Sequence, residues 1–129
     1  MVTYTIDAKE RLIRTRCSGF VNVEEVTEHF RELASDPACP DYLDVLLDLS
    51  SINSLPDKRE LQAVTVELGR VRARVRFGLC AIVVERLVLY GMLRMFSVMA
   101  QDYFSSIRVF RDIAEAEAWL ASQRLPAEQ

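Results

Sequence analysis

The sequence has few of the residues on which most catalytic and metal sites depend. One histidine and three cysteines occur in 129 residues, and the cysteines are too widely spaced for a disulfide framework or a CxxC metal motif. The four glycines form neither a GxGxxG pattern nor a P-loop. No nucleophile with a base and an orienting group can be named. We therefore expect a protein that is not an enzyme, with no catalytic residues, no metal and no cofactor.

The histidine and the cysteines have structural interpretations. His29 lies beside the apolar face of a predicted helix, and we interpret it as a surface or half-buried residue. Cys80 falls inside an apolar strand, as is typical of an inert core residue. The spacing leaves open a pairing of His29 with Cys17 or Cys39, although no local pattern supports it.

The charge balance argues against a nucleic-acid partner. Sixteen basic and nineteen acidic residues give a net charge of −3, so there is no overall positive field to attract a phosphate backbone. The densest charged feature is the run Arg70, Arg72, Arg74 and Arg76, at the end of a predicted helix. We interpret these arginines as solvated cations near the negative end of the helix dipole, with an acidic partner surface or an anionic ligand as the alternative.

The sequence predicts no membrane span. The apolar segment 77–100 is interrupted by Glu85, Arg86 and Arg94, whereas a spanning helix needs about twenty nearly uncharged residues. The first twelve residues lack the basic start and apolar core of a secretory signal. Because the cysteines are also few and unpaired in pattern, we expect a cytoplasmic protein.

The hydrophobic pattern predicts strands and helices in the order ββαβαβαβα. It places a hairpin at 2–7 and 11–17 and further strands at 42–49, 77–84 and 107–110. Asn22, Asp57 and Asp112, each followed by glutamate three residues on, predict capping boxes of helices; the first two end near 35 and 74. A further helix is predicted at 86–101. This order indicates one α/β domain over 1–125, with a mostly parallel sheet, an antiparallel N-terminal edge strand and a short polar tail at 126–129.

The predicted helix at 86–101 is apolar nearly all round. Its leucine, valine, methionine and aromatic side chains leave few positions for a polar face, so a helix on one side of a sheet would expose some of them. Three interpretations stay open: a deeply buried helix, a surface for self-association, or the wall of a pocket for an apolar ligand.

Three segments, DVLLDLSSI, LYGMLRMFSVMA and VFRDIAEAEAWL, together with the order of elements, resemble the SpoIIAA-like family, a branch of the STAS superfamily. The likeness covers nearly the whole chain. It implies a compact regulatory or scaffold domain that binds other proteins. STAS-like domains are also similar in architecture to lipid-binding Sec14-type domains, so an apolar or lipid-like ligand is the alternative.

The sequence departs from this family at the site of regulation. In STAS anti-sigma-factor antagonists a serine of a DSSG-like turn is phosphorylated, and this sequence reads Pro-Asp-Lys-Arg at the corresponding residues 56–59. The resemblance therefore implies that the phosphoacceptor is missing. Asp57 fits the N-cap of a helix, and a permanently charged mimic of phosphoserine is the alternative.

The candidate binding face is the edge beyond the carboxyl ends of the strands, where ligands bind in open α/β sheets. Tyr90 and Arg94 lie one helical turn apart and suit a polar head group over an apolar wall. The candidate binding residues are Asp48, Ser50, Ser51, Asp57, Arg86, Tyr90, Gly91 and Arg94. The expected function is a non-catalytic interaction or regulatory module that forms a homodimer or binds another protein; the alternative is a carrier or sensor of a small apolar ligand.

Overall fold

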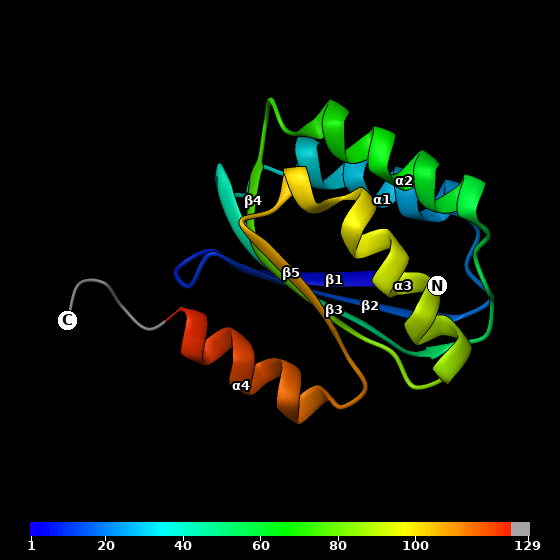
Figure 1. Cartoon of the computed structure of the whole chain (residues 1–129). Helices are drawn as coiled ribbons and strands as arrows, with labels where there is room; N and C mark the ends of the chain where they lie inside the picture. Colours follow the sequence, from blue (N-terminus) through cyan, green and yellow to red (C-terminus); the bar gives the residue numbers. More distant parts are fainter. Residues whose placement is uncertain (125–129) are drawn as a thin grey trace.

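The computed structural model describes residues 1–124, which form a five-stranded sheet with helices on both faces (Figure 1). The elements are β1 (Val2–Asp7), β2 (Leu12–Gly19), α1 (Val23–Ser35), β3 (Tyr42–Ile52), α2 (Lys58–Val71), β4 (Arg76–Val83), α3 (Leu87–Met99), the short 3-10 helix η1 (Gln101–Tyr103), β5 (Ser106–Phe110) and α4 (Ile113–Gln123). The predicted α/β fold and its order of elements are confirmed. The tail predicted at 126–129 lies outside the described residues.

The strands follow their chain order across the sheet, β1-β2-β3-β4-β5. β1 is antiparallel to β2, and the other neighbours are parallel, as predicted. The three parallel connections run in the same direction across the sheet and share one hand, so α1, α2 and α3 all lie on one face. α4 follows the last strand and packs on the other face (Figure 1).

Three predicted details differ from the structure. β3 continues to Ile52 because its last two residues pair with Ser18 and Gly19 of β2. α2 ends at Val71, and the chain then turns, with Arg74 donating its backbone N–H to the Val71 carbonyl at 2.9 Å. Asp112 caps α4 through the backbone N–H of Ala114, so the predicted capping box with the third helical residue does not form.

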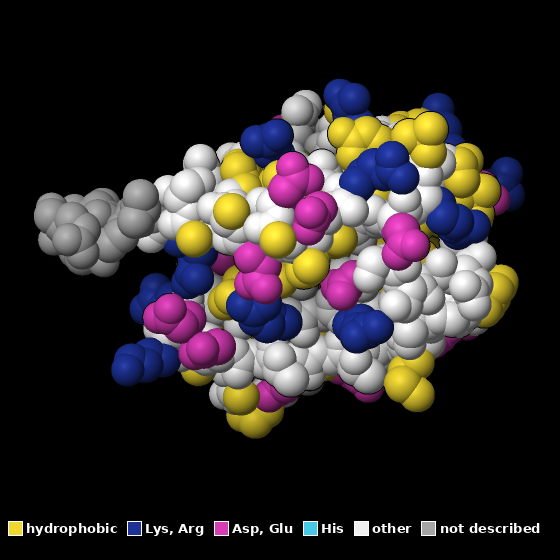
Figure 2. All heavy atoms as spheres, turned by 90° about the horizontal axis from the view of Figure 1, so that it is seen from below, with side chains coloured by type: hydrophobic (Ala, Val, Ile, Leu, Met, Phe, Trp, Pro, Cys, Tyr) yellow, Lys and Arg dark blue, Asp and Glu magenta, His cyan; other side chains and the backbone are white. Residues whose placement is uncertain are grey.

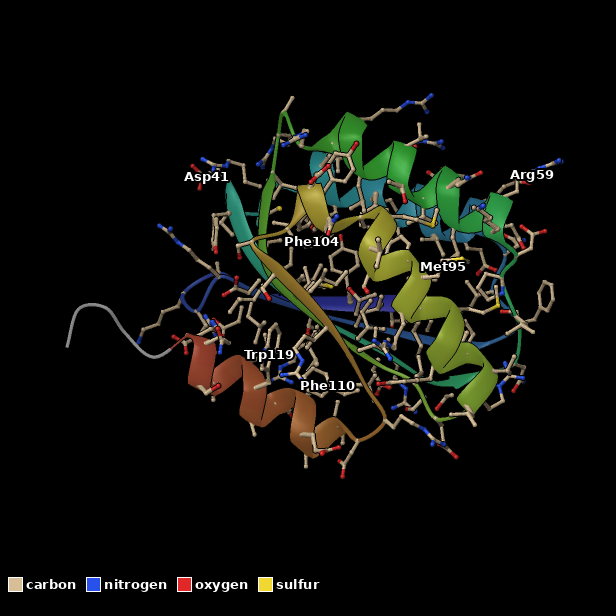
Figure 3. All side chains as sticks on the ribbon, in the orientation of Figure 1. Asp41, Arg59, Met95, Phe104, Phe110 and Trp119 are labelled. Atoms are coloured by element: carbon tan, nitrogen blue, oxygen red, sulfur yellow. The ribbon has the colours of Figure 1, made fainter. Side chains whose placement is uncertain are left out.

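The apolar core has one cluster on each face of the sheet. The larger cluster lies beneath α1, α2 and α3 and includes Leu33, Leu68 and Leu93. The smaller one lies under α4, where Phe110 of β5 and Trp119 of α4 face each other with ring centroids 5.6 Å apart (Figure 3). The two clusters bury both faces of β3 and β4, as expected for nearly continuous apolar strands.

α3 is buried on one side only, although its sequence is apolar nearly all round. Leu89, Leu93 and Phe96 are buried against the sheet, whereas Leu87, Val88 and Val98 are exposed. A helix packed on one face of a sheet buries only one side, and here the outer side is also apolar. Within residues 1–124, no helix has the length and apolarity needed to cross a bilayer.

The capping of α2 by Asp57 is a testable contribution to stability. The Asp57 carboxylate accepts from the Glu60 backbone N–H at 2.8 Å, and the Glu60 carboxylate accepts from the Asp57 N–H at 3.0 Å. Asp57→Ala should lower the free energy of unfolding by about 1 kcal/mol, whereas Asp57→Asn, an equally good cap, should change it by only about 0.3 kcal/mol. Denaturant unfolding measures both. An Asn variant as unstable as the Ala variant would show that the charge, and not the cap, is what matters.

Candidate functional site

A cavity of about 130 Å³ lies between the sheet and α1, α2 and α3. Its wall is mostly apolar and takes side chains from all three helices, among them Val26, Leu61 and Leu93. Protein interiors are close-packed and contain few voids larger than a water molecule. An apolar cavity well above that size remains dry and accepts small apolar molecules.

The floor of the cavity explains why the space is not filled. Val45 of β3 and Cys80 of β4 are neighbours in the sheet, Val64 lies on α2, and the small side chains of all three line the cavity. Val45 and Leu47 lie in the central strand beneath the helices, yet they are only half-buried. A small side chain at each facing position leaves volume that the neighbours cannot close without moving backbone.

The two ends of the cavity differ. Aromatic side chains close one end, where Phe77 and Phe104 lie with ring centroids 5.6 Å apart, and Phe104 points inward from the segment after η1 (Figure 3). At the other end the wall consists of loop residues that follow β2 and β3, including Val21, Ser54 and Pro56. The cavity therefore extends to the carboxyl edge of the parallel strands, the predicted binding face.

Exposed apolar side chains gather at this carboxyl edge. The described residues include nine large hydrophobic side chains that are exposed, and six of them lie in or beside segments at this edge: Met1, Phe20, Leu55, Leu87, Val88 and Ile113. Exposed apolar residues grouped on one side of a protein mark an interaction surface or a ligand entrance. Phe20 and Leu55 are next in sequence to the lining residues Val21, Ser54 and Pro56, and this position favours an entrance.

Thr15 and His29 are the buried polar pair in the described part of the wall. Thr15 is 3% exposed and His29 7%, and the Thr15 hydroxyl lies 3.4 Å from His29 Nε2. The other ring nitrogen, Nδ1, has no hydrogen-bond partner among the described residues. Burial lowers the pKa of His29 to about 4, so the imidazole is neutral at neutral pH.

The expectation that His29 is a surface or half-buried residue is wrong. His29 follows Val26 by three positions and precedes Leu33 by four, which puts all three on one face of α1. The hairpin of β1 and β2 covers that face, and the Tyr4 ring centroid lies 5.0 Å from the imidazole. Its place in the apolar stripe was the signal that indicated burial.

The described cysteines do not form a reactive pair with His29. Burial raises the pKa of the Cys17 thiol to about 11, and the imidazole contacts the Thr15 hydroxyl instead of a thiol. Burial also raises the pKa of Cys39, whose thiol donates to the Pro40 carbonyl at 3.3 Å, and that of Cys80, a core residue. The thiolate is the nucleophilic form of cysteine, and burial disfavours it at all three positions. Across residues 1–124, no three metal-binding side chains come together.

The cavity wall has almost no charge. Glu60 is the single charged side chain among the described lining residues, and its carboxylate is occupied by the Asp57 backbone N–H. Lysine and arginine are absent from the described wall. A charged group in the cavity would lose its hydration without gaining a counter-ion, which is costly.

The predicted residues Asp48, Ser50 and Ser51 lie at the carboxyl end of β3 but not in the cavity wall. Leu47 and Leu49 point into the cavity, so by alternation Asp48 points to the opposite face, where its carboxylate accepts from both the N–H and the hydroxyl of Ser50. That side of the molecule, with α4, carries interspersed acidic and basic side chains (Figure 2). These three residues form a polar cluster separate from the cavity.

The remaining predicted residues also lie outside the cavity wall. Arg86 donates to the Ser54 carbonyl at 3.0 Å and ties the start of α3 to the β3–α2 loop. Arg94 is exposed and its guanidinium stacks over the ring of Tyr90, 5.9 Å from the centroid, while Gly91 lies exposed between them. Asp57 is occupied as the cap of α2. α3 contributes Leu89, Leu93 and Phe96 to the cavity wall instead.

Comparison with known proteins identifies no relative of this chain. No protein-family model matches the chain, and a search of curated proteins gives no match. The likeness to the SpoIIAA-like family therefore stays a prediction.

The buried imidazole predicts a pH-dependent stability. The unfolded chain binds a proton at His29 below its ordinary pKa of 6.5, whereas the folded protein binds it only near pH 4. The contribution of His29 to the free energy of unfolding is therefore fully present above pH 6.5. It falls by up to about 3 kcal/mol as the pH is lowered from 6.5 to 4. Denaturant unfolding at several pH values measures it. His29→Leu should remove this part of the slope, and an unchanged slope would contradict the assignment, because the chain has one histidine.

Proposed function

We propose that this protein binds and carries a small, uncharged, mainly apolar molecule in the cavity between the sheet and α1, α2 and α3. The observation that carries the proposal is the cavity itself, an unfilled apolar space beneath three helices. Filling it would bury apolar surface of the ligand and restore the contacts that its lining atoms lack. In this proposal the protein performs no chemistry on the ligand.

The wall defines the ligand class. A carboxylate or phosphate would find no described lysine or arginine in the wall and would lie near Glu60, so an uncharged ligand is favoured. The pair of Thr15 and His29 offers a hydroxyl and a neutral imidazole for one polar group, such as an alcohol or a carbonyl. Ligand pockets of this kind combine an apolar wall with a few polar groups that fix orientation.

The exposed apolar residues at the carboxyl edge support a route for such a ligand. Phe20 and Leu55 stand on the loops that follow β2 and β3, next to the loop residues that line the cavity. An apolar molecule that enters here loses its contact with water gradually.

Binding of 1-octanol tests the proposal. Isothermal titration calorimetry at pH 7 should detect 1-octanol and give weaker binding of octanoate, whose charge has no partner in the wall. Val64→Phe, which fills the cavity from α2, should weaken octanol binding by about tenfold, or about 1.4 kcal/mol. The matched control is Val66→Phe, at an exposed position on the outer side of the same helix.

Two results would contradict the proposal. One is the absence of saturable octanol binding by a folded wild-type protein. The other is equal weakening by both phenylalanine variants, which would place octanol somewhere other than the cavity.

The outer side of α3 favours self-association as a second candidate function. Leu87, Val88 and Val98 are exposed there, with Leu87 68% and Val98 64% exposed. An apolar strip on a surface helix is typical of a helix-to-helix contact. This candidate corresponds to the interaction module that the sequence led us to expect.

Analytical ultracentrifugation of Val88→Glu tests self-association. The wild type should sediment as a dimer and the variant as a monomer, because two glutamates would be buried in a symmetric contact. Val66→Glu on α2 is the control, since Val66 is similarly exposed on another helix. Met92 is half-buried against the core and is less suitable, because a charge there would also destabilise the fold. A wild type that stays monomeric at all concentrations would exclude this candidate.

A further inference from the structure

A second hollow, of about 310 Å³, lies at the amino edge of the parallel strands, opposite the edge that the cavity reaches. We call it the arginine hollow. It is lined by Arg11, Asp41, Tyr42, Arg72, Ala73, Arg74 and Arg76. Figure 3 shows Asp41 at this edge and Arg59 at the other end of the molecule.

The sheet topology brings these residues together. β2, β3 and β4 are parallel and begin at the same edge, so Arg11, Tyr42 and Arg76 stand at or just before three neighbouring strand starts. Backbone bonds fix the arrangement: the Arg11 carbonyl accepts from the Asp44 N–H at 2.9 Å, and the Asp41 carbonyl accepts from the Arg76 N–H at 2.8 Å. Arg72 and Arg74 arrive from the turn that connects α2 to β4.

The hollow holds an excess of positive charge. Four arginines and one acidic residue, Asp41, line it, and none of the four arginines makes an ion pair within the described part of the chain. The negative end of the α2 dipole offsets only about half a charge. Cations placed together in this way repel one another unless an anion lies among them.

The four arginines are held to different degrees. Arg74 donates to the Cys39 carbonyl at 2.9 Å, and Arg72 stacks over the Tyr103 ring, 5.0 Å from its centroid. Among the described residues, the side chains of Arg11 and Arg76 have no hydrogen-bonding or stacking partner. Arg11 also has a φ of 53°, in the left-handed region where glycine or asparagine is less strained. Two guanidinium groups of the hollow are therefore held by protein contacts and two are free to contact a ligand.

We propose that the arginine hollow binds a small anion that carries phosphate groups. Guanidinium groups match phosphate oxygens through paired N–H donors, and several around one hollow suit the charge of a diphosphate. The concave shape favours a compact ligand. The net charge of −3 over the whole chain disfavours a long nucleic acid, which would extend beyond the hollow. This site is independent of the apolar cavity and does not rest on the function proposed for it.

Titration with inorganic pyrophosphate tests the site. Calorimetry at pH 7 and low salt should give saturable binding that weakens as salt is added. Arg76→Gln should weaken it about tenfold, as expected for the loss of a charged hydrogen-bonding contact. Arg59→Gln is the matched control, since it removes the same charge from an exposed arginine at the opposite edge and should leave binding within about a factor of two.

Arg11→Gln supplies a second variant from another strand start, and thermal unfolding verifies that each variant is folded. Any one of three results would overturn the proposal. Equal weakening by Arg76→Gln and Arg59→Gln would show a general charge effect. An oligoglutamate peptide that binds more tightly than pyrophosphate, or the absence of saturable pyrophosphate binding to the wild type, would exclude a phosphate site.

Discussion

The placement of three crossover helices on one face of the sheet is the constraint on which the rest of the structure depends. Because the parallel connections share one hand and the strands follow chain order, α1, α2 and α3 have no other face available. The side chains of these three helices and of one sheet face therefore pack into a single core layer. Where the facing side chains are short, as at Val45, Val64 and Cys80, they leave the cavity. α4 alone covers the other face, over a smaller core.

The same topology separates two kinds of chemistry. At the carboxyl edge, loops carry exposed apolar side chains such as Phe20 and Leu55 next to the cavity. At the amino edge, strand starts carry arginines around a hollow. A parallel sheet has two unlike ends, and here one end has exposed apolar side chains beside the cavity while the other has arginines around the hollow. Our two proposals, an uncharged apolar ligand and a phosphate-bearing anion, are therefore compatible in one small domain.

The buried polar groups differ in how well they are satisfied. Asp44 accepts from the Leu79 N–H at 2.8 Å and from Arg124 at 2.9 Å. Glu67 lies between Arg31 and Arg70, at 3.4 and 3.5 Å, and joins α1 to α2. His29 has one long contact and one unpartnered nitrogen. Buried polar groups in native proteins almost always have partners, so an exception in the wall of a cavity is consistent with binding there.

The sequence by itself determined the elements and their order, because periodicity and capping are local properties of the chain. The boxes at Asn22 and Asp57 form as predicted, and the fold is as expected. The residues predicted for binding, such as Asp48 and Tyr90, lie outside the cavity, and His29 is buried against expectation. Only the tertiary structure decided these features. A cavity or a hollow depends on which side chains from distant segments of the chain lie close together. A local sequence pattern does not specify the distances between such segments.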